Sequence, residues 1–209
     1  MAKAHSWETK VNLQKEYPMA LVCKQCPKCG SKNSVKIVYG LPDYQLYEKF
    51  QAGKIKLGGC CMIDGQPEYF CRDCENKWNT KQVIDAAYSK ISTIKASVGG
   101  YWGDNYDVEI DFVHLCVTWK RYGNGVEVKE TRKRIRESTK EHFLEQLKRT
   151  DLLNWKAKYL DMEICDGTSW SVEIITDAKH TRKYGINKFP EEWHLFCQLI
   201  AKTAAQKFR

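Results

Sequence analysis

The alternation of apolar and polar residues in the second half of the chain predicts an antiparallel sheet. In the segment 106–120, YDVEIDFVHLCVTWK, apolar side chains recur at every second position, which predicts a strand with a bulge or register change near Val113. The pair Asn124-Gly125 then has the composition of a tight turn, so a second strand should return antiparallel to the first. Further strands are predicted at 159–165 and 169–176, on either side of the turn Asp166-Gly167, and from His180 to Tyr184.

Helical periodicity, with apolar residues three and four positions apart, marks four segments. They are 42–52, 79–92, 138–149 and 190–208. Asn79 or Thr80 can cap the second helix. Ser138 and Glu141 have the spacing of a capping box at the third, and Pro190 suits the first turn of the fourth. The first helix has one apolar stripe, which we expect to pack against the rest of the protein: Tyr44, Leu46, Tyr47 and Phe50.

Four cysteines in two C-x-x-C pairs have the spacing of metal ligands. The pairs are Cys26-Pro-Lys-Cys29 and Cys71-Arg-Asp-Cys74, and each can bend so that both sulfurs face one point. Four thiolates satisfy the tetrahedral preference of Zn²⁺ at about 2.3 Å. Because such a site leaves no position for water, we expect one zinc ion with a structural role. Reduced cysteines without a metal are the alternative.

The choice of ligands has alternatives as well. Cys23 forms another C-x-x-C pair with Cys26, and Cys60 and Cys61 are further candidates to replace a ligand. Gly30 favours the pair Cys26 and Cys29, because a metal-binding turn needs backbone freedom directly after its second cysteine. The remaining cysteines are expected to be buried as small apolar side chains: Cys116, Cys165 and Cys197.

The sequence resembles zinc-ribbon proteins of bacteria and phages that have no assigned function. The segments that carry this resemblance are CPKCGSKNSVKIVYGLP at 26–42, GKIKLGGCC at 53–61 and YFCRDCENKW at 69–78. It implies a ribbon that holds zinc through the four cysteines of the two pairs. Two later segments, CDGTSWSVEI at 165–174 and YGINKFPEEWHLF at 184–196, resemble a small α+β domain of uncharacterised bacterial proteins. Neither resemblance implies an activity.

Three glycines break the periodic patterns near the middle of the chain. Gly99, Gly100 and Gly103 predict a loop, and we expect a domain boundary near 95–104. The predicted fold class is α+β, with a zinc ribbon that contains a helical insertion at 1–98 and a small antiparallel sheet-and-helix domain at 104–209. Four tryptophans of the second domain are expected to fill its core: Trp119, Trp155, Trp170 and Trp193.

Composition places the protein among soluble, globular chains. Its 209 residues are 43% hydrophobic, which is enough for one domain or two small ones. No apolar run approaches the roughly 20 residues of a membrane span, and the first residues lack the apolar stretch of a signal peptide. We therefore expect a cytoplasmic protein, in which cysteines bind metal or are buried instead of forming disulfides.

Several enzyme signatures are missing from the sequence. No His is followed two positions later by the Glu that a zinc deaminase needs, and the sequences H-E-x-x-H and G-x-S-x-G do not occur. A nuclease would have to use carboxylates of the second half, which we interpret as the solvated face of a sheet: Asp107, Glu109, Asp111, Glu163, Asp166, Glu173 and Asp177. We therefore expect no catalytic activity.

The charge distribution permits a polyanionic partner. Of the net charge of +8, residues 1–99 contribute +6, from 15 Lys and Arg against nine Asp and Glu. The densest basic run provides four candidate nucleic-acid-binding residues: Lys129, Arg132, Arg134 and Arg136. In an extended strand the three arginines would point the same way, with Tyr39, Tyr69 and Trp78 as further surfaces for base stacking.

Two other interpretations of the basic run remain. A solvated hairpin edge needs no ligand, and Glu127, Glu130 and Glu137 dilute the positive charge. A protein partner is the other alternative, with the chain acting as an inhibitor or regulator of the phage or defence-system type. The sequence favours nucleic acid over protein by a small margin.

Overall fold

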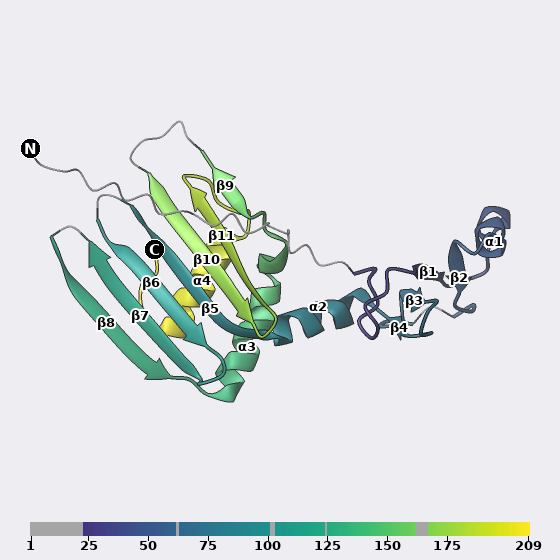
Figure 1. Ribbon diagram of the computed structural model, residues 1–209, viewed down its shortest axis with the longest axis horizontal. Helices are drawn as coiled ribbons and strands as arrows, with labels where there is room; N and C mark the ends of the chain where they lie inside the picture. The colour runs from purple at the N-terminus through teal and green to yellow at the C-terminus, as the bar shows by residue number, and fades with distance from the viewer. Residues whose placement is uncertain (1–22, 62, 101–102, 124, 162–166) are drawn as a thin grey trace, which may run out of the picture.

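The computed structural model of the protein contains two β-sheets that one helix connects (Figure 1). The residues that it describes are 23–61, 63–100, 103–123, 125–161 and 167–209. The first sheet has four strands within residues 34–78, and the second has seven strands and begins at Ile91. The predicted α+β class is therefore confirmed.

The four-stranded sheet, hereafter the small sheet, has the order β2-β1-β3-β4. Its strands are β1 (Ser34–Val38), β2 (Ile55–Leu57), β3 (Tyr69–Cys71) and β4 (Lys77–Trp78). Helix α1 (Tyr44–Gln51) connects β1 to β2, and this crossover lets the two strands run parallel. Strand β3 runs antiparallel to β1 and places Cys71 opposite Ser34. The pairing thus brings the start of β1 beside the end of β3, which are the places of the two C-x-x-C pairs.

Helix α1 forms where the sequence predicts it but does not pack as predicted. Asp43 caps the helix, because its carboxylate accepts a hydrogen bond of 2.8 Å from the backbone N–H of Leu46. No residue of the helix is buried, and Tyr44 and Tyr47 are 76% and 47% exposed. The helix contacts β2, whose three residues offer little surface to cover it. The expectation that the apolar stripe packs against the protein is therefore wrong.

Helix α2 (Thr80–Ser89) connects the two sheets. Asn79 caps it, and the side chains of Asn79 and Gln82 form a reciprocal capping box. Near its start, Val83 packs against the apolar cluster around Trp78 in the small sheet. Near its end, Tyr88 is 1% exposed and belongs to the core of the other sheet. One helix therefore contributes to both apolar clusters.

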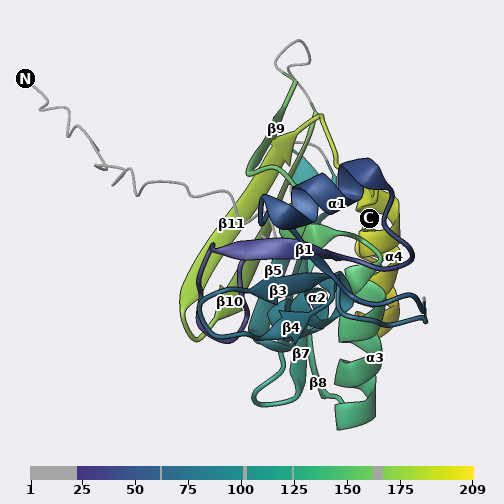
Figure 2. The same cartoon turned by 90° about the vertical axis from the view of Figure 1, so that its right-hand side faces the viewer.

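The seven-stranded sheet, hereafter the large sheet, has the order β8-β7-β6-β5-β10-β11-β9. Its strands are β5 (Ile91–Gly100), β6 (Asn105–Asp111), β7 (Cys116–Gly123), β8 (Val126–Arg134), β9 (Lys158–Leu160), β10 (Thr168–Thr176) and β11 (Lys179–Ile186). Neighbouring strands are antiparallel except β9 and β11, which are parallel. Helices α3 (Glu137–Lys148) and α4 (Trp193–Ala204) lie on one face of the sheet (Figure 2), and the short helix η1 (Leu152–Asn154) follows α3.

The main core lies between the large sheet and its two helices. Burial alternates along β6, where Tyr106, Val108 and Ile110 face inward. The predicted core tryptophans, Trp119, Trp155, Trp170 and Trp193, are each at most 6% exposed, so this prediction is confirmed. The rings of Trp155, Trp170 and Trp193 contact one another, with centroids 4.6 to 6.0 Å apart. Such aromatic contacts stabilise the core beyond the effect of the area that they bury.

The course of β5 contradicts the loop predicted around Gly99 and Gly100. Residues 95–100 belong to this strand, which pairs with β6 on one side and β10 on the other. A Cβ atom at Gly99 would lie 1.8 Å from the side chain of Asn105, so this glycine permits close approach of two strands instead of a turn. Because the large sheet begins at Ile91, the boundary predicted between residues 98 and 104 falls inside it. The division into two domains itself stays a prediction.

The single strand predicted at 106–120 is also wrong. It is two strands, β6 and β7, joined by a turn in which Leu115 has a left-handed backbone with φ of +51°. The carboxylate of Asp111 stabilises the turn by accepting backbone hydrogen bonds of 2.9 Å from Val113 and His114. Apolar residues continue through this turn, which is why the period-two pattern does not reveal it.

Other predictions in the second half are confirmed in part. Strands β7 and β8 form the predicted antiparallel hairpin, although Asn124 lies outside the described residues. Helix α3 begins at Glu137 with Arg136 as its N-cap and no side-chain cap, so the capping box predicted for Ser138 is wrong. Strand β9 pairs with β11, not with β10, and the predicted turn at Asp166 lies outside the described residues.

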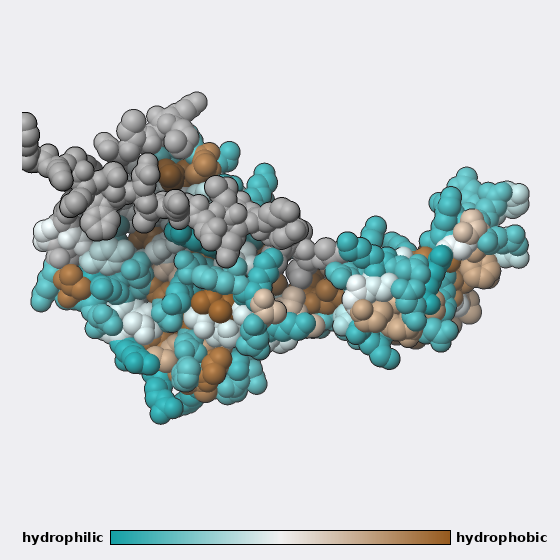
Figure 3. Space-filling view, in the orientation of Figure 1, coloured by the Kyte–Doolittle hydropathy of each residue, from teal (hydrophilic) through white to brown (hydrophobic). Residues whose placement is uncertain are grey.

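The face of the large sheet opposite the helices carries polar and charged side chains. Figure 3 shows that hydrophilic residues dominate the part of this face that can be seen. Lys95 forms a salt bridge of 3.3 Å with Glu109 across β5 and β6. The other predicted surface carboxylates found here include Asp107 and Glu173, while Glu163 lies outside the described residues. No helix in the described part of the chain is long and apolar enough to cross a membrane.

Candidate metal centre and anion-binding groove

The pairing of β1 with β3 brings the two C-x-x-C pairs together. The sulfur atoms of Cys26, Cys29, Cys71 and Cys74 all lie within 4.8 Å of one another. Two distances between the pairs, from Cys26 to Cys74 and from Cys29 to Cys71, are 3.6 Å. In a tetrahedral site with zinc–sulfur bonds of about 2.3 Å, neighbouring sulfurs lie about 3.8 Å apart. The predicted cysteines are therefore close enough to hold a metal ion, and their spacing fits zinc.

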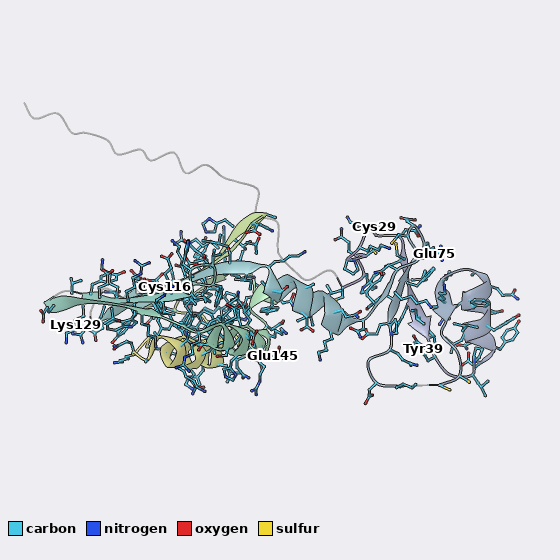
Figure 4. All side chains as sticks on the ribbon, turned by 90° about the horizontal axis from the view of Figure 1, so that it is seen from below. Cys29, Tyr39, Glu75, Cys116, Lys129 and Glu145 are labelled. Atoms are coloured by element: carbon cyan, nitrogen blue, oxygen red, sulfur yellow. The ribbon has the colours of Figure 1, made fainter. Side chains whose placement is uncertain are left out.

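The two C-x-x-C turns share the same backbone hydrogen bonds. The N–H of Gly30 donates to the carbonyl of Cys26 at 2.9 Å, and the N–H of Glu75 donates to the carbonyl of Cys71 at 3.0 Å. In each turn the N–H of the first cysteine also donates to the carbonyl five residues later, at 2.9 Å. Gly30 and Glu75 thus hold equivalent places, both with a left-handed backbone, at φ of +72° and +60°. Figure 4 shows Cys29 and Glu75 at the same end of the small sheet, away from Tyr39.

This equivalence predicts opposite effects of two substitutions. A left-handed backbone costs a non-glycine residue about 1–2 kcal/mol, and the greater chain entropy of unfolded glycine offsets about 0.5–1 kcal/mol of that. We expect Glu75→Gly to raise the stability of the small sheet by up to about 1 kcal/mol and Gly30→Ala to lower it by about 1 kcal/mol. Amide hydrogen exchange in β1 and β3 measures both changes.

The space around Gly30 allows the effect of Gly30→Ala to be attributed to the backbone. A Cβ atom there would meet only Nε2 of Gln25, at 3.9 Å, so a loss of stability would report backbone strain and not a collision. Destabilisation by Glu75→Gly as large as that by Gly30→Ala would contradict the equivalence of the two turns.

Polar side chains connect the two turns. The carboxylate of Asp73 accepts hydrogen bonds from the hydroxyl of Ser31 and from the side-chain amide of Asn33, the latter at 2.6 Å. These hydrogen bonds, that of Ser31 first, lower the pKa of Asp73. The backbone N–H of Arg72 also donates to the carbonyl of Asn33 at 3.0 Å. The sequence did not single out these residues, because their contacts exist only once β1 and β3 are paired.

Trp78 packs against the cysteines of the site in one apolar cluster. It is 1% exposed, stacks on Tyr69 with ring centroids 5.8 Å apart, and donates from Nε1 to the carbonyl of Cys23 at 2.9 Å. Its predicted role as a surface for base stacking is therefore wrong, since the ring is covered. The fully buried residues of the apolar cluster beside the site are Cys26, Cys71 and Trp78.

The pKa values of the cysteines indicate why a bound cation would stabilise the cluster. Burial raises the pKa of Cys26, but hydrogen bonds from the backbone N–H groups of Cys29 and Lys28 outweigh this and lower it to about 6. The N–H of Ser31 lowers the pKa of Cys29, yet the neighbouring sulfurs, Cys74 first, raise it to about 12. One thiolate thus disfavours the next, and a bound cation removes this repulsion.

The other cysteines do not join this group. Of the described residues, those that group as metal ligands are the four predicted ones, and neither Cys23 nor Cys60 nor Cys61 replaces any of them. Cys116 and Cys197 are buried, as predicted, whereas Cys165 lies outside the described residues.

Comparisons with protein-family models and with curated proteins give no match for this chain. The functional interpretation of the small sheet therefore rests on the four-cysteine cluster. That the ion is zinc, and that the fold is a zinc ribbon, stay predictions.

The predicted basic run does not form one stripe. Strand β8 ends at Arg134, and Arg136 is the N-cap residue of α3, so the three arginines do not share one strand face. Nε of Arg132 donates to the sulfur of Cys116 at 3.0 Å. Lys129 lies five residues before Arg134, about 16 Å along the strand. Figure 4 shows Lys129 at the far end of the sheet from Glu145 on α3.

Arg134 and Arg136 instead border a groove between α3 and α4. It consists of two hollows of about 370 and 320 Å³ that share His142, Leu199 and Lys202. We call this feature the α3–α4 groove. The cationic residues that line it are Lys133, Arg134, Arg136, Arg149 and Lys202.

The groove lacks compensating negative charge. None of its lining residues is Asp or Glu, and within the described part of the chain none of its five cations forms an ion pair. On α3 the acidic residues occupy another stripe, where Glu137 and Glu145 pair with Lys140 and Lys148. The sequence contains the helical spacing of His142, Gln146 and Arg149, but only the fold shows that Lys202 of α4 lies opposite them.

Proposed function

We propose that the protein is a zinc-stabilised nucleic-acid-binding protein and that the α3–α4 groove is its binding surface. The observation that carries the proposal is the set of five cations along this groove, which form no ion pair with any described residue and have no carboxylate among the described residues beside them. Unneutralised positive charges in a concave surface raise the local concentration of anions and attract phosphate groups.

The length of the groove favours a polymer over a small anion. From Arg136 to Arg149 the helix advances by about 20 Å at 1.5 Å per residue. A nucleic-acid strand advances by about 3.4 Å per nucleotide in a duplex, so the groove spans roughly six nucleotides. Gln146 and Gln198 lie between the charged residues and can donate further hydrogen bonds to phosphates or bases.

The zinc in this proposal stabilises the small sheet and does no chemistry. Cys26, Cys29, Cys71 and Cys74 would hold the ion, and four thiolates leave no position for a reacting water molecule. When bound, the ion supplies folding free energy to a unit with few buried apolar side chains. Helix α2 then connects this sheet to the large sheet, because it packs into both apolar clusters.

Binding of the full-length protein to single-stranded and duplex DNA and RNA tests the proposal. We expect measurable affinity at roughly 50 mM salt and a steep loss with added salt, because each phosphate contact contributes roughly −0.7 to −0.9 to the slope of log K against log salt. Slopes near −3 to −5 would correspond to about five contacts. Absence of binding to all four ligands at roughly 50 mM salt would overturn the proposal.

A protein partner is the second candidate, and the exposed stripe of α1 favours it. Leu41 is 90% exposed and Tyr44 is 76% exposed, and the stripe continues to Tyr47 and Phe50. Apolar and aromatic side chains of this kind supply much of the binding energy in protein interfaces. An inhibitor or regulator would use this face, and capture of one host protein by the wild type but not by Tyr44→Ala with Tyr47→Ala would then favour it.

A further inference from the structure

Two adjacent cysteines on the loop after β2 lie outside the four-sulfur cluster and face the solvent. Cys60 and Cys61 are both exposed, and their sulfur atoms are 3.9 Å apart. Side chains of consecutive residues in an extended strand point to opposite sides, so this proximity requires a bent backbone. The backbone bends at Cys60 itself, directly after Gly59, whose φ is +100°.

The loop that carries the two sulfurs is attached at several points. The N–H of Gly40 donates to the carbonyl of Gly59 at 2.9 Å, and Nε2 of Gln66 donates to the carbonyl of Cys61 at 3.1 Å. Gly58 lies so close to Tyr39 that a Cβ atom there would be 2.3 Å from the ring. The backbone that carries the sulfur pair is thus held just before the pair, at Gly58 and Gly59, and by one side-chain hydrogen bond at Cys61.

A disulfide and a second zinc site both fit this pair poorly. Consecutive Cα atoms are about 3.8 Å apart, below the usual 4.4–6.8 Å of disulfides, and such strain makes the bond easy to reduce. Zinc prefers four ligands. Of the described His, Cys, Asp and Glu residues, none joins Cys60 and Cys61 in a group of three or more.

We propose that Cys60 and Cys61 form a second, exposed metal site that binds one soft monovalent cation of the class of Cu(I). Thiolates select such ions, which accept two or three sulfur ligands. If the metal–sulfur bonds have the zinc–sulfur length of about 2.3 Å, a separation of 3.9 Å gives a sulfur–metal–sulfur angle of about 116°, near the trigonal value. The third position then remains open to a small thiol, which would make the ion exchangeable.

Titration of the zinc-loaded, full-length protein with Cu(I) under anaerobic conditions tests this site. The ion is supplied as its bicinchoninate complex, and zinc released from the protein is measured in the same sample. We expect one Cu(I) to bind per chain while zinc is retained. Cys60→Ser and Cys61→Ser should each lower the affinity by about 100-fold or more, because the second sulfur binds at a high effective concentration.

Cys23→Ser is the matched control, since it removes a half-buried cysteine that also lies outside the four-sulfur group, and it should bind Cu(I) like the wild type. Three results would overturn the proposal. The first is no uptake of Cu(I) by the wild type, and the second is full affinity in either single variant. The third is uptake by the variant that combines Cys60→Ser with Cys61→Ser, accompanied by the release of one zinc ion for each Cu(I) bound. The test does not depend on nucleic-acid binding, because the loop is not part of the α3–α4 groove.

Discussion

Cys26→Ser and Cys74→Ser should each unfold the small sheet under conditions in which Cys23→Ser leaves it folded. Among the described residues of this sheet and its cysteine turns, the buried apolar side chains are Cys26, Ile37, Cys71 and Trp78, so the sheet has little stability of its own. Structural zinc sites contribute apparent binding free energies of about 10–16 kcal/mol, and the loss of one of four ligands removes a large part of this. The sulfur of Cys23 contributes to none of the described ligand groups.

Zinc content and amide hydrogen exchange measure this prediction together. In the two ligand variants we expect substoichiometric zinc and rapid exchange in β1 and β3, with protection retained in β5 and β6 of the large sheet. The Cys23→Ser variant is the matched control, because it removes a cysteine next to the site. One zinc per chain in Cys74→Ser, or equal exchange in all three variants, would contradict the assignment of the ligands.

The second prediction compares two pairs of arginine and lysine residues that the sequence placed in one basic run. Arg134 and Arg136 line the α3–α4 groove, whereas Lys129 and Arg132 do not. Replacing both residues of a pair by Ala removes the same charge in each case. We expect the groove pair to weaken nucleic-acid binding by about 10- to 100-fold and to flatten the salt slope by about 1.4–1.8 units, and the other pair to have much less effect.

Fluorescence anisotropy with a labelled oligonucleotide over a series of salt concentrations provides both quantities. Circular dichroism and the melting temperature of each variant serve as controls for folding. Equal losses for both pairs would show that only net charge matters, and a larger loss for Lys129 and Arg132 would place the binding surface on the hairpin instead of the groove.

The sequence predicted the parts of the structure that depend on local chemistry. The spacing of the cysteine pairs identified four residues whose sulfurs lie within 4.8 Å of one another. The cap at Asn79 and the apolar period of 79–92 located helix α2 to within three residues at its end. Each of these signals arises from neighbours in the chain, so the sequence contains them directly.

Features that depend on contacts between distant segments were not predictable in the same way. Gly99 and Gly100 have the composition of a loop, but they lie in strand β5, where other segments of the same chain, at Asn105 and Gly167, approach closely. The stripe of α1 has the pattern of a buried face, but the short strand β2 that the helix contacts leaves no residue of α1 buried. The α3–α4 groove joins Arg134 with Lys202, which are far apart in the sequence.

The central claim is that the two C-x-x-C pairs hold one structural zinc ion, and the metal itself tests it most directly. Elemental analysis combined with X-ray absorption at the zinc edge should find one zinc per chain of the purified wild type, with four sulfur ligands at about 2.3 Å. A folded protein without zinc, or a zinc ion with nitrogen or oxygen ligands in place of any of these sulfurs, would contradict the account.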